Sequence, residues 1–279
     1  MLLSFVIPCY HSAATLPEVV SEIKATVERD GRYGYEIILV NDNPPDDTYE
    51  VIRRLAREDR NIKGICMSRN FGQHAALMAG YREVQGDIVI SLDDDGQTPA
   101  DQLFRLVEAL KEDVDVVYAR YPSKKHSPFR NFGTYMNEKM AVWLLGKPKN
   151  LHITSYFAMR PLVVEQIVQY HNPYSYVEGL VLRATSRVIN VPVEHRARES
   201  GESGYTFSKL LSLWLNGFTA FSVKPLRVGT LAGTVLMILG FLSAMIVLVQ
   251  KLRLGDAIDA GWSLSLIHIS ETTRPRLIS

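Results

Sequence analysis

Three consecutive carboxylates, Asp93, Asp94 and Asp95, follow a short apolar run, and Gln97 and Pro99 stand shortly after them. In an extended chain alternate side chains face the same side, so we expect Asp93 and Asp95 to converge on one cation while Asp94 points away. Oxygen ligands of this kind suit Mg²⁺ or Mn²⁺, which share their remaining positions with water and substrate phosphates. The alternative is a solvated acidic turn that caps a helix beginning near Pro99.

A further carboxylate, Asp42, follows another apolar run in the segment 40–48. A carboxylate in this position can accept hydrogen bonds from a base or a ribose, which makes Asp42 a candidate nucleoside ligand. Asp46 and Asp47 precede Thr48, where we expect a helix to begin, and either of them can cap that helix. We assign ligand binding to Asp42 alone.

Short β-branched runs that alternate with helical patterns must position these carboxylates. This alternation is typical of a mostly parallel sheet with helices on its faces. The predicted strands are residues 3–7, 36–40, 62–67, 88–92 and 114–118. Because ligands of such sheets bind beyond the carboxyl ends of the strands, we expect the polar residues after each strand to gather at one edge. They are Pro8-Cys9-Tyr10, Asn41-Asp42, Ser68-Arg69-Asn70 and Asp93-Asp94-Asp95.

The composition favours one α/β domain with an additional segment, since the chain has 279 residues of which 47% are hydrophobic. A net charge of +1 gives no basic excess, so no nucleic-acid partner is expected. Cys9 and Cys66 are expected to be reduced, buried and without chemistry. Pro8 interrupts the first apolar run, which has no basic segment before it, so we predict a strand there and not a signal peptide. The N-terminal domain is therefore expected in the cytoplasm.

An uncharged apolar run over residues 228–249 lies between two pairs of basic residues, Lys224 with Arg227 and Lys251 with Arg253. About 20 such residues span a bilayer core of roughly 30 Å, which predicts a transmembrane helix. Before it, residues 205–221 carry aromatic and leucine side chains at helical spacing. This pattern fits an amphipathic helix in the membrane interface, and an ordinary core-facing helix is the alternative.

Together these motifs resemble those of the family-2 glycosyltransferases. Residues 6–10 are similar to the family's opening Val-x-Pro-x-Tyr, Asn41-Asp42 to its Asp-Asp pair, and residues 70–80 to the stretch before its metal motif. Residues 93–99 resemble the Asp-x-Asp-x-Gln-x-Pro segment of the polyisoprenyl-phosphate branch, which includes dolichyl-phosphate mannose synthases and bacterial undecaprenyl-phosphate glycosyltransferases. The resemblance runs from about residue 3 to about residue 262 and implies a GT-A, Rossmann-like fold.

The resemblance also implies roles for individual residues. The nucleotide would be held by Pro8, Tyr10, Asp42 and Asp93, and the metal by Asp93, Asp95 and Gln97. The catalytic group would comprise Asp93, Asp95 and Arg120. The phosphates and the acceptor would be held by Arg120, Arg130, Arg198 and Ser203, since guanidinium groups bind phosphate oxygens through two parallel hydrogen bonds.

Two departures from the family pattern bear on the mechanism. Gly204 replaces the lysine of the element Arg-x-x-Gly-x-Ser-Lys-Tyr, and residues 152–156 contain no carboxylate where many relatives carry an aspartate, before a strand that ends near Met159. A hydroxyl acceptor must lose a proton during attack, whereas a phosphate monoester, with a second pKa of about 6, is already largely ionised at neutral pH. We therefore expect direct displacement with inversion, in which the cation and Arg120 stabilise the departing diphosphate.

The resemblance thus implies a metal-dependent inverting glycosyltransferase that moves a sugar from a nucleotide diphosphate-sugar to a polyisoprenyl (undecaprenyl) phosphate. We expect it in the cell inner membrane with its catalytic domain in the cytoplasm. The sequence leaves open whether it forms a homo-oligomer. Two alternatives are a transferase acting on a saccharide hydroxyl and a non-catalytic membrane scaffold that binds nucleotide-sugar. The absence of a Gln-x-x-Arg-Trp motif argues against a processive polysaccharide synthase.

The predicted organisation has four parts. A GT-A catalytic domain covers residues 1–204, a juxtamembrane amphipathic helix 205–225, a transmembrane helix 226–252 and a truncated tail 253–279. From about residue 265 the tail resembles a translated sequencing adaptor, with Thr272 in place of the usual proline. We expect the natural chain to continue into a second transmembrane helix that begins near Trp262.

Overall fold

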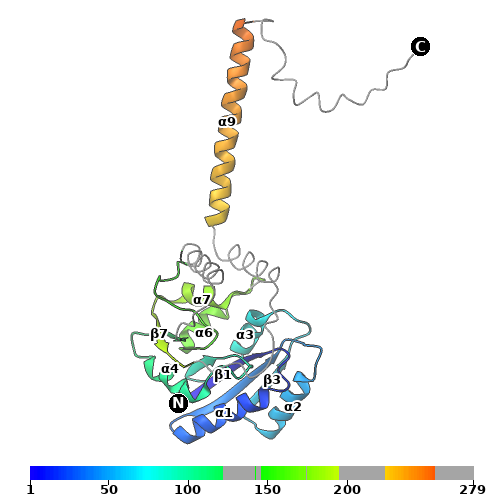
Figure 1. Ribbon diagram of the computed structural model, residues 1–279, viewed down its shortest axis with the longest axis vertical. Helices are drawn as coiled ribbons and strands as arrows, with labels where there is room; N and C mark the ends of the chain where they lie inside the picture. The colour runs from blue at the N-terminus through cyan, green and yellow to red at the C-terminus, as the bar shows by residue number, and fades with distance from the viewer. Residues whose placement is uncertain (122–141, 143–145, 174, 195–223, 255–279) are drawn as a thin grey trace, which may run out of the picture. The chain divides into compact units, whose positions relative to one another are not determined.

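The computed structural model describes residues 1–121, 142, 146–173, 175–194 and 224–254. The chain divides into two compact units, Met1–Ser222 and Val223–Ser279 (Figure 1). The first unit contains a seven-stranded sheet with the strand order β3-β2-β1-β4-β6-β5-β7. The strands are β1 (Leu2–Cys9), β2 (Gly34–Asn41), β3 (Ile62–Cys66), β4 (Ile88–Ser91), β5 (Val116–Arg120), β6 (Phe157–Met159) and β7 (Val188–Pro192).

The sheet is mixed and mostly parallel, as predicted. Only β6 runs against its neighbours: it pairs antiparallel with β4 and β5, whereas the other strand pairs are parallel. The five strands expected from the apolar runs are all present, with small shifts at their ends. Strand β7 was not predicted, and β6 was expected only through the family resemblance.

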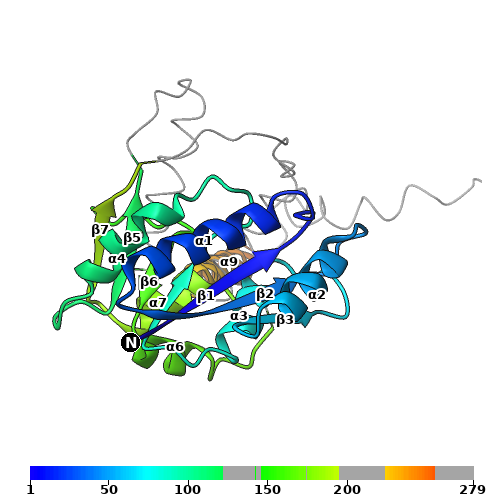
Figure 2. The same ribbon diagram turned by 90° about the horizontal axis from the view of Figure 1, so that it is seen from below.

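Helices cover both faces of the sheet, which explains why its central strands are continuous apolar runs. Along β1, Phe5 and Ile7 pack with residues of α1 (Leu16–Asp30), α2 (Thr48–Glu58) and α4 (Leu103–Ala109). The intervening Val6 packs with α3 (Gln73–Tyr81), α6 (Pro161–Ile167) and α7 (Val177–Ala184). Figure 2 shows α1 and α6 on opposite sides of the sheet. The single-turn helix η1 (Ala100–Gln102) leads into α4.

Helix α3 lies close against β1 and β2 because Gly80 has no side chain. A Cβ at this position would stand 2.4 Å from Val6 Cγ1 and 3.1 Å from Val40 Cγ2. A larger residue would therefore push the helix away from the sheet. This contact sets the distance between α3 and the strands that carry the candidate site.

The second unit contains α9 (Lys224–Leu254). Its segment Leu226–Val249 has 24 residues and a mean hydropathy of 2.5, and it is long and apolar enough to cross a membrane. At about 1.5 Å per residue such a helix exceeds the roughly 30 Å of a bilayer's hydrocarbon core. The apolar run noted in the sequence is therefore helical throughout.

Candidate functional site

The candidate site lies at the edge of the sheet where β1, β2 and β4 end. These strands are neighbours and run parallel, so their carboxyl ends share one edge. Tyr10, Asp42 and Asp93 follow them, as the sequence predicts. Strand β4 ends at Ser91, however, so the three carboxylates lie beyond the strand, and Asp94 and Asp95 occupy a bend.

Asp93 accepts hydrogen bonds from two side chains. Its Oδ1 accepts a hydrogen bond from Gln73 Nε2 at 3.0 Å, and its Oδ2 accepts one from the Ser155 hydroxyl. Burial, together with the negative charges of Asp95 and Asp94, raises the pKa of Asp93 to about 6. Sequence reasoning identified Asp93 but neither of its partners, which stand in segments that were singled out for other reasons.

Asp94 faces the segment after β1 and has partners different from those of Asp93. Its Oδ2 accepts the backbone N–H of Tyr10 at 3.0 Å, and its carbonyl oxygen accepts the Thr15 hydroxyl at 2.6 Å. Burial raises the pKa of Asp94 above its ordinary value. Asp94 therefore joins the carboxylate segment to the loop between β1 and α1, a role that the sequence did not indicate.

Asp95 closes a tight turn. Its Oδ1 accepts the backbone N–H of Gln97 at 3.0 Å, and Gly96 between them has a φ of +72°. The following helix η1 has Pro99 at its N-cap and no side-chain capping bond. The carboxylates thus do not cap that helix, and the capping alternative loses its structural basis.

The donor set suits a divalent cation. Among the described residues no group of three or more His, Cys, Asp or Glu side chains stands ready to hold a metal ion. Asp93 and Asp94 are nevertheless enclosed beside Asp95, and within the described part of the chain no Lys or Arg forms an ion pair with any of the three. Crowded carboxylates without a cationic partner are stabilised by a hard cation, which prefers such oxygen donors.

Asp42 is almost completely buried, with 3% of its surface exposed. Its Oδ1 accepts the backbone N–H of Phe71 at 2.8 Å and its Oδ2 that of Gly72 at 2.9 Å. Burial raises the pKa of Asp42 despite these two bonds, which lower it. Asp42 therefore fixes the segment before α3, a structural role that sequence reasoning missed.

Two half-exposed aromatic rings stand near this carboxylate. Pro8 is buried within β1, whereas Tyr10 and Phe71 each have 47% of their surface exposed. The Arg69 guanidinium lies 4.6 Å from the centre of the Phe71 ring. The backbone of Phe71 bonds Asp42, and Tyr10 follows β1, next to β2. Exposed rings in these places can stack on a planar group.

Arg120 is the last residue of β5 and is exposed. Because β5 runs parallel to β4, Arg120 ends its strand at the same edge as the carboxylates. The adjacent Ala119 carbonyl accepts the Thr154 hydroxyl at 2.9 Å, next to the Ser155 that bonds Asp93. The other predicted phosphate and acceptor residues, Arg130, Arg198 and Ser203, lie outside the described residues, as does the predicted interface helix before residue 224.

The helix-capping question near Thr48 is settled in favour of Asp46. Asp46 Oδ1 accepts the backbone N–H of Thr48 at 3.4 Å, whereas Asp47, the N-cap residue of α2, makes no side-chain capping bond. The prediction that both cysteines are buried is half wrong, because Cys9 is buried but Cys66 is exposed. Cys66 ends β3, which is the edge strand beside β2 in the sheet formed by the described residues.

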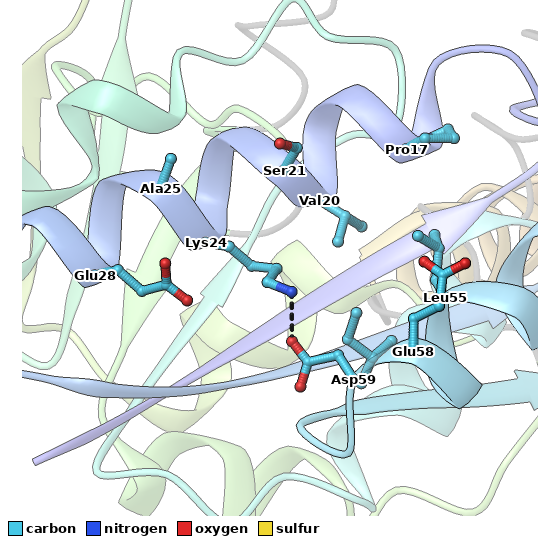
Figure 3. A pocket seen from close by; sticks show the side chains of 10 residues that line it. Pro17, Val20, Ser21, Lys24, Ala25, Glu28, Leu55, Glu58 and Asp59 are labelled. Carbon is cyan, nitrogen blue, oxygen red and sulfur yellow. Dashed lines mark ion pairs between the residues drawn. The ribbon is translucent and has the colours of Figure 1, made fainter.

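A groove of about 410 Å³ lies elsewhere, between α1 and α2 (Figure 3). The Lys24 ammonium pairs with the Asp59 carboxylate there at 2.7 Å, and the two groups neutralise one another. None of the predicted site residues lines this groove. It is a surface feature of two amphipathic helices and not the candidate site.

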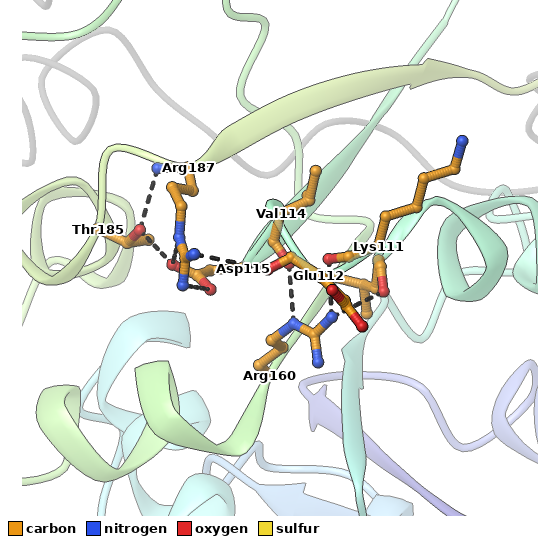
Figure 4. Close-up of polar contacts among 8 residues, drawn as sticks. Lys111, Glu112, Val114, Asp115, Arg160, Thr185 and Arg187 are labelled. Carbon is orange, nitrogen blue, oxygen red and sulfur yellow. Dashed lines mark hydrogen bonds and ion pairs between the residues drawn. The ribbon is translucent and has the colours of Figure 1, made fainter.

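Polar contacts hold the other half of the sheet together (Figure 4). Arg187 pairs with the buried Asp115 at 2.8 Å, and Thr185 donates a hydrogen bond to the same carboxylate at 2.5 Å. Arg160 donates to the carbonyl oxygens of Val114 and Leu110, each at 2.9 Å. These contacts hold β5, β6 and β7 beside one another; Arg120 ends β5, and Ser155 lies just before β6.

Comparisons with known proteins agree with this arrangement. The family model "Glycosyl transferase family 2" matches residues 4–166. The undecaprenyl-phosphate 4-deoxy-4-formamido-L-arabinose transferase of Proteus mirabilis is 33% identical over 254 residues, covering 90% of this chain and 77% of the relative. The enzyme of the same name from Edwardsiella ictaluri is also 33% identical, over 90% of this chain and 78% of its own.

Solved structures show the same GT-A type of fold. The glucosyl-3-phosphoglycerate synthase of Mycobacterium tuberculosis, in complex with Mn²⁺, UDP-glucose and phosphoglyceric acid, matches with a TM-score of 0.53 and 19% identity over 76% of this chain and 75% of that one. The mannosyl-3-phosphoglycerate synthase of Rubrobacter xylanophilus matches with a TM-score of 0.55 and 16% identity, over 82% and 75%. By its sequence and its fold, the chain belongs to glycosyltransferase family 2.

Proposed function

We propose that this chain transfers a sugar from a nucleoside diphosphate to a polyisoprenyl phosphate, undecaprenyl phosphate, with the help of a divalent cation. The observation that carries the proposal is the enclosed Asp93, with Asp94 and Asp95 beside it, at the sheet edge shared with Asp42 and Tyr10. The names of relatives that are 33% identical over 90% of the chain support the acceptor.

The nucleoside end of the donor would contact Pro8, Tyr10 and Asp42. The Tyr10 ring is half exposed and can stack on a base. Asp42 already accepts one backbone N–H at each oxygen, and each carboxylate oxygen has a second lone pair for a ribose or base donor. Asp93 would extend the same site to the diphosphate.

The cation, Mg²⁺ or Mn²⁺, would be held by Asp93, Asp95 and Gln97. When bound it supplies positive charge next to the leaving diphosphate. Asp94 is not among the proposed ligands; its Oδ2 accepts the Tyr10 backbone N–H and joins the carboxylate segment to the loop after β1. Ser155 and Gln73 would orient Asp93 through their hydrogen bonds.

The acceptor phosphate would be held by Arg120 together with Arg130, Arg198 and Ser203. Residues 152–156 place hydroxyl groups, and no carboxylate, beside Asp93 and β5. An acceptor that is already ionised needs no general base. The absence of a carboxylate in this segment therefore fits a phosphate acceptor better than a hydroxyl one, and direct attack would invert the anomeric centre.

Residues 226–252 would anchor the enzyme in the inner membrane, with the catalytic domain, residues 1–204, on the cytoplasmic side and residues 205–225 in the membrane interface. The length and apolar composition of α9 support the anchor. A membrane-bound enzyme meets a lipid-linked phosphate at the bilayer surface, where the acceptor is confined.

The test combines membranes that contain the full chain with undecaprenyl phosphate, Mn²⁺ or Mg²⁺, and a panel of labelled nucleotide sugars. We expect label to become extractable into organic solvent with at least one donor. A nucleotide-linked 4-deoxy-4-formamido-L-arabinose, the sugar in the relatives' names, belongs in the panel. Label in an added saccharide in preference to lipid would favour the hydroxyl-acceptor alternative, and no transfer from any donor would refute the proposal.

A further inference from the structure

His74 and Glu178 form a pair between α3 and α7. His74 Nδ1 lies 3.4 Å from Glu178 Oε2, and the two side chains are 18% and 20% exposed. Both atoms are inaccessible to solvent, and in the described part of the chain neither has a hydrogen-bond partner. A buried polar atom without a partner is costly, and the 3.4 Å approach of these two atoms is a polar contact that can reduce this cost.

The imidazole of His74 also contacts the residue at the N-terminus of α7. The rings of His74 and Tyr176, the N-cap residue of α7, meet edge to face with their centres 5.1 Å apart. No Lys or Arg among the described residues pairs with Glu178, whose carboxylate instead faces the His74 imidazole. The N-cap residue and the first turn of α7 thus both contact the His74 side chain of α3.

That side chain belongs to the turn of α3 that reaches the candidate site. Gln73, the residue before His74, donates a hydrogen bond to Asp93 at 3.0 Å. Gly72 at the N-cap of α3 offers no side-chain cap and adopts a φ of +90°. The helix start must therefore be fixed by its neighbours: Asp42 holds Gly72 on one side, and Glu178 faces His74 on the other.

We propose that His74 and Glu178 are positioning residues. They hold the first turn of α3 so that Gln73 keeps its hydrogen bond to Asp93, and this bond orients the Asp93 carboxylate for cation binding. The inference rests on the proposed function for the role of Asp93. Hydrogen-bond partners of metal ligands typically change metal affinity by about 10- to 100-fold when they are removed. His74 and Glu178 would act on the carboxylate through one such partner.

The first measurement is Mn²⁺ binding by titration calorimetry to the detergent-solubilised full chain. We expect His74→Ala to weaken binding by about tenfold, as for loss of an outer partner of a ligand. Glu178→Gln, which keeps the length of the side chain and an oxygen that can face the imidazole, should retain most of the affinity. The matched control is His171→Ala, since His171 is exposed and outside the pair, and it should bind Mn²⁺ like the natural chain.

A double variant separates positioning from general weakening of the fold. In a Gln73→Ala background, His74→Ala should change Mn²⁺ affinity by less than about twofold, since coupled residues are not additive. Full additivity of the two changes, or unchanged affinity in His74→Ala, would overturn the proposal.

Hydrogen exchange tests the same idea without a metal. The backbone N–H groups of Ala75 and Ala76 bond the Gly72 carbonyl and report on the first turn of α3. They should exchange faster in His74→Ala than in the natural chain or in His171→Ala, and equal exchange would count against the pair. If the natural chain binds no Mn²⁺, the cation in the proposed function fails, and the exchange result then decides the positioning role.

Discussion

Asp42 Oδ2 accepts the backbone N–H of Gly72 at 2.9 Å, across 30 positions of sequence. The bond joins the end of β2 to the start of α3, and Asp42 Oδ1 repeats the connection with Phe71. A residue that the family resemblance assigns to the nucleoside therefore also builds the loop beside it. Donor binding and local stability should be coupled at this position.

Asp42→Asn tests that coupling. An asparagine presents one acceptor oxygen and an NH₂ group, so one of the two backbone N–H donors loses its partner and faces another donor. We expect the free energy of unfolding to fall by about 1–3 kcal/mol, the usual cost of an unsatisfied buried group. Chemical denaturation measures this change, and nucleoside diphosphate binding should weaken in the same variant.

Asp47→Asn is the matched control, since Asp47 is exposed and makes no capping bond. It should leave both stability and nucleotide binding unchanged. If Asp42→Asn weakens nucleotide binding at unchanged stability, the two backbone bonds contribute nothing to the loop, and the structural role assigned to Asp42 is wrong.

Asp95→Asn should remove transfer while keeping the fold. The asparagine Oδ1 can still accept the Gln97 backbone N–H, so the turn at Gly96 survives. We expect transfer to fall by about 100-fold or more, because charge stabilisation worth several kcal/mol depends on this carboxylate. Organic-phase label measures the loss, and the circular dichroism spectrum and the unfolding midpoint report on the fold.

Asp113→Asn controls for the removal of a negative charge as such. Asp113 is exposed and precedes β5, at the sheet edge opposite the carboxylates. This variant should transfer sugar normally. Full activity in Asp95→Asn would exclude this carboxylate from cation binding and would leave the cation without one of its proposed ligands.

The central strands could be predicted from the sequence because they are buried on both faces and therefore consist mostly of apolar residues. Strand β1 is buried from Leu3 to Cys9, so apart from Ser4 its residues are apolar on both faces. The edge strand β7 is different: residues 188–192 are half-buried or exposed, and Asn190 and Pro192 interrupt its apolar residues, so they form no continuous run. Cys66 was misjudged for the same reason, because β3 buries only one of its five residues.

The candidate site divides in the same way. The carboxylates after β4 could be found because they stand together in sequence at a strand end. Their partners could not, since Gln73 and Ser155 lie 20 and 62 positions from Asp93 and meet it only through the packing of α3 and β6. Hydrogen bonds over such separations depend on the tertiary structure, which no local pattern encodes.

Stability should depend on acidity through Asp115. Burial favours the neutral form, but hydrogen bonds from Arg187 and Thr185 outweigh it and hold the pKa of Asp115 below its ordinary value. A lowered folded-state pKa adds stability that is complete above the unfolded pKa of about 3.9 and is lost as the pH falls through the folded value. The natural chain should therefore lose this contribution on acidification below about pH 4.

Comparison of Asp115→Asn with the natural chain isolates this effect. At neutral pH we expect the variant to be less stable by about 1–3 kcal/mol, from weakened hydrogen bonds to a charged group. The difference should shrink as the pH falls below about 4. Denaturant unfolding of the solubilised protein at several pH values measures it, and a difference that is constant with pH would exclude titration of Asp115 as its source.

The side of the membrane on which the catalytic domain lies can be read from Cys66. The chain has two cysteines, of which Cys66 is exposed and Cys9 is buried. Burial also raises the pKa of the Cys9 thiol and disfavours its reactive thiolate. A membrane-impermeant maleimide should thus label the folded chain at Cys66, and Cys66→Ser should abolish the labelling. If the domain is cytoplasmic, intact cells should show no labelling until their inner membrane is permeabilised, whereas equal labelling before and after would place the domain outside.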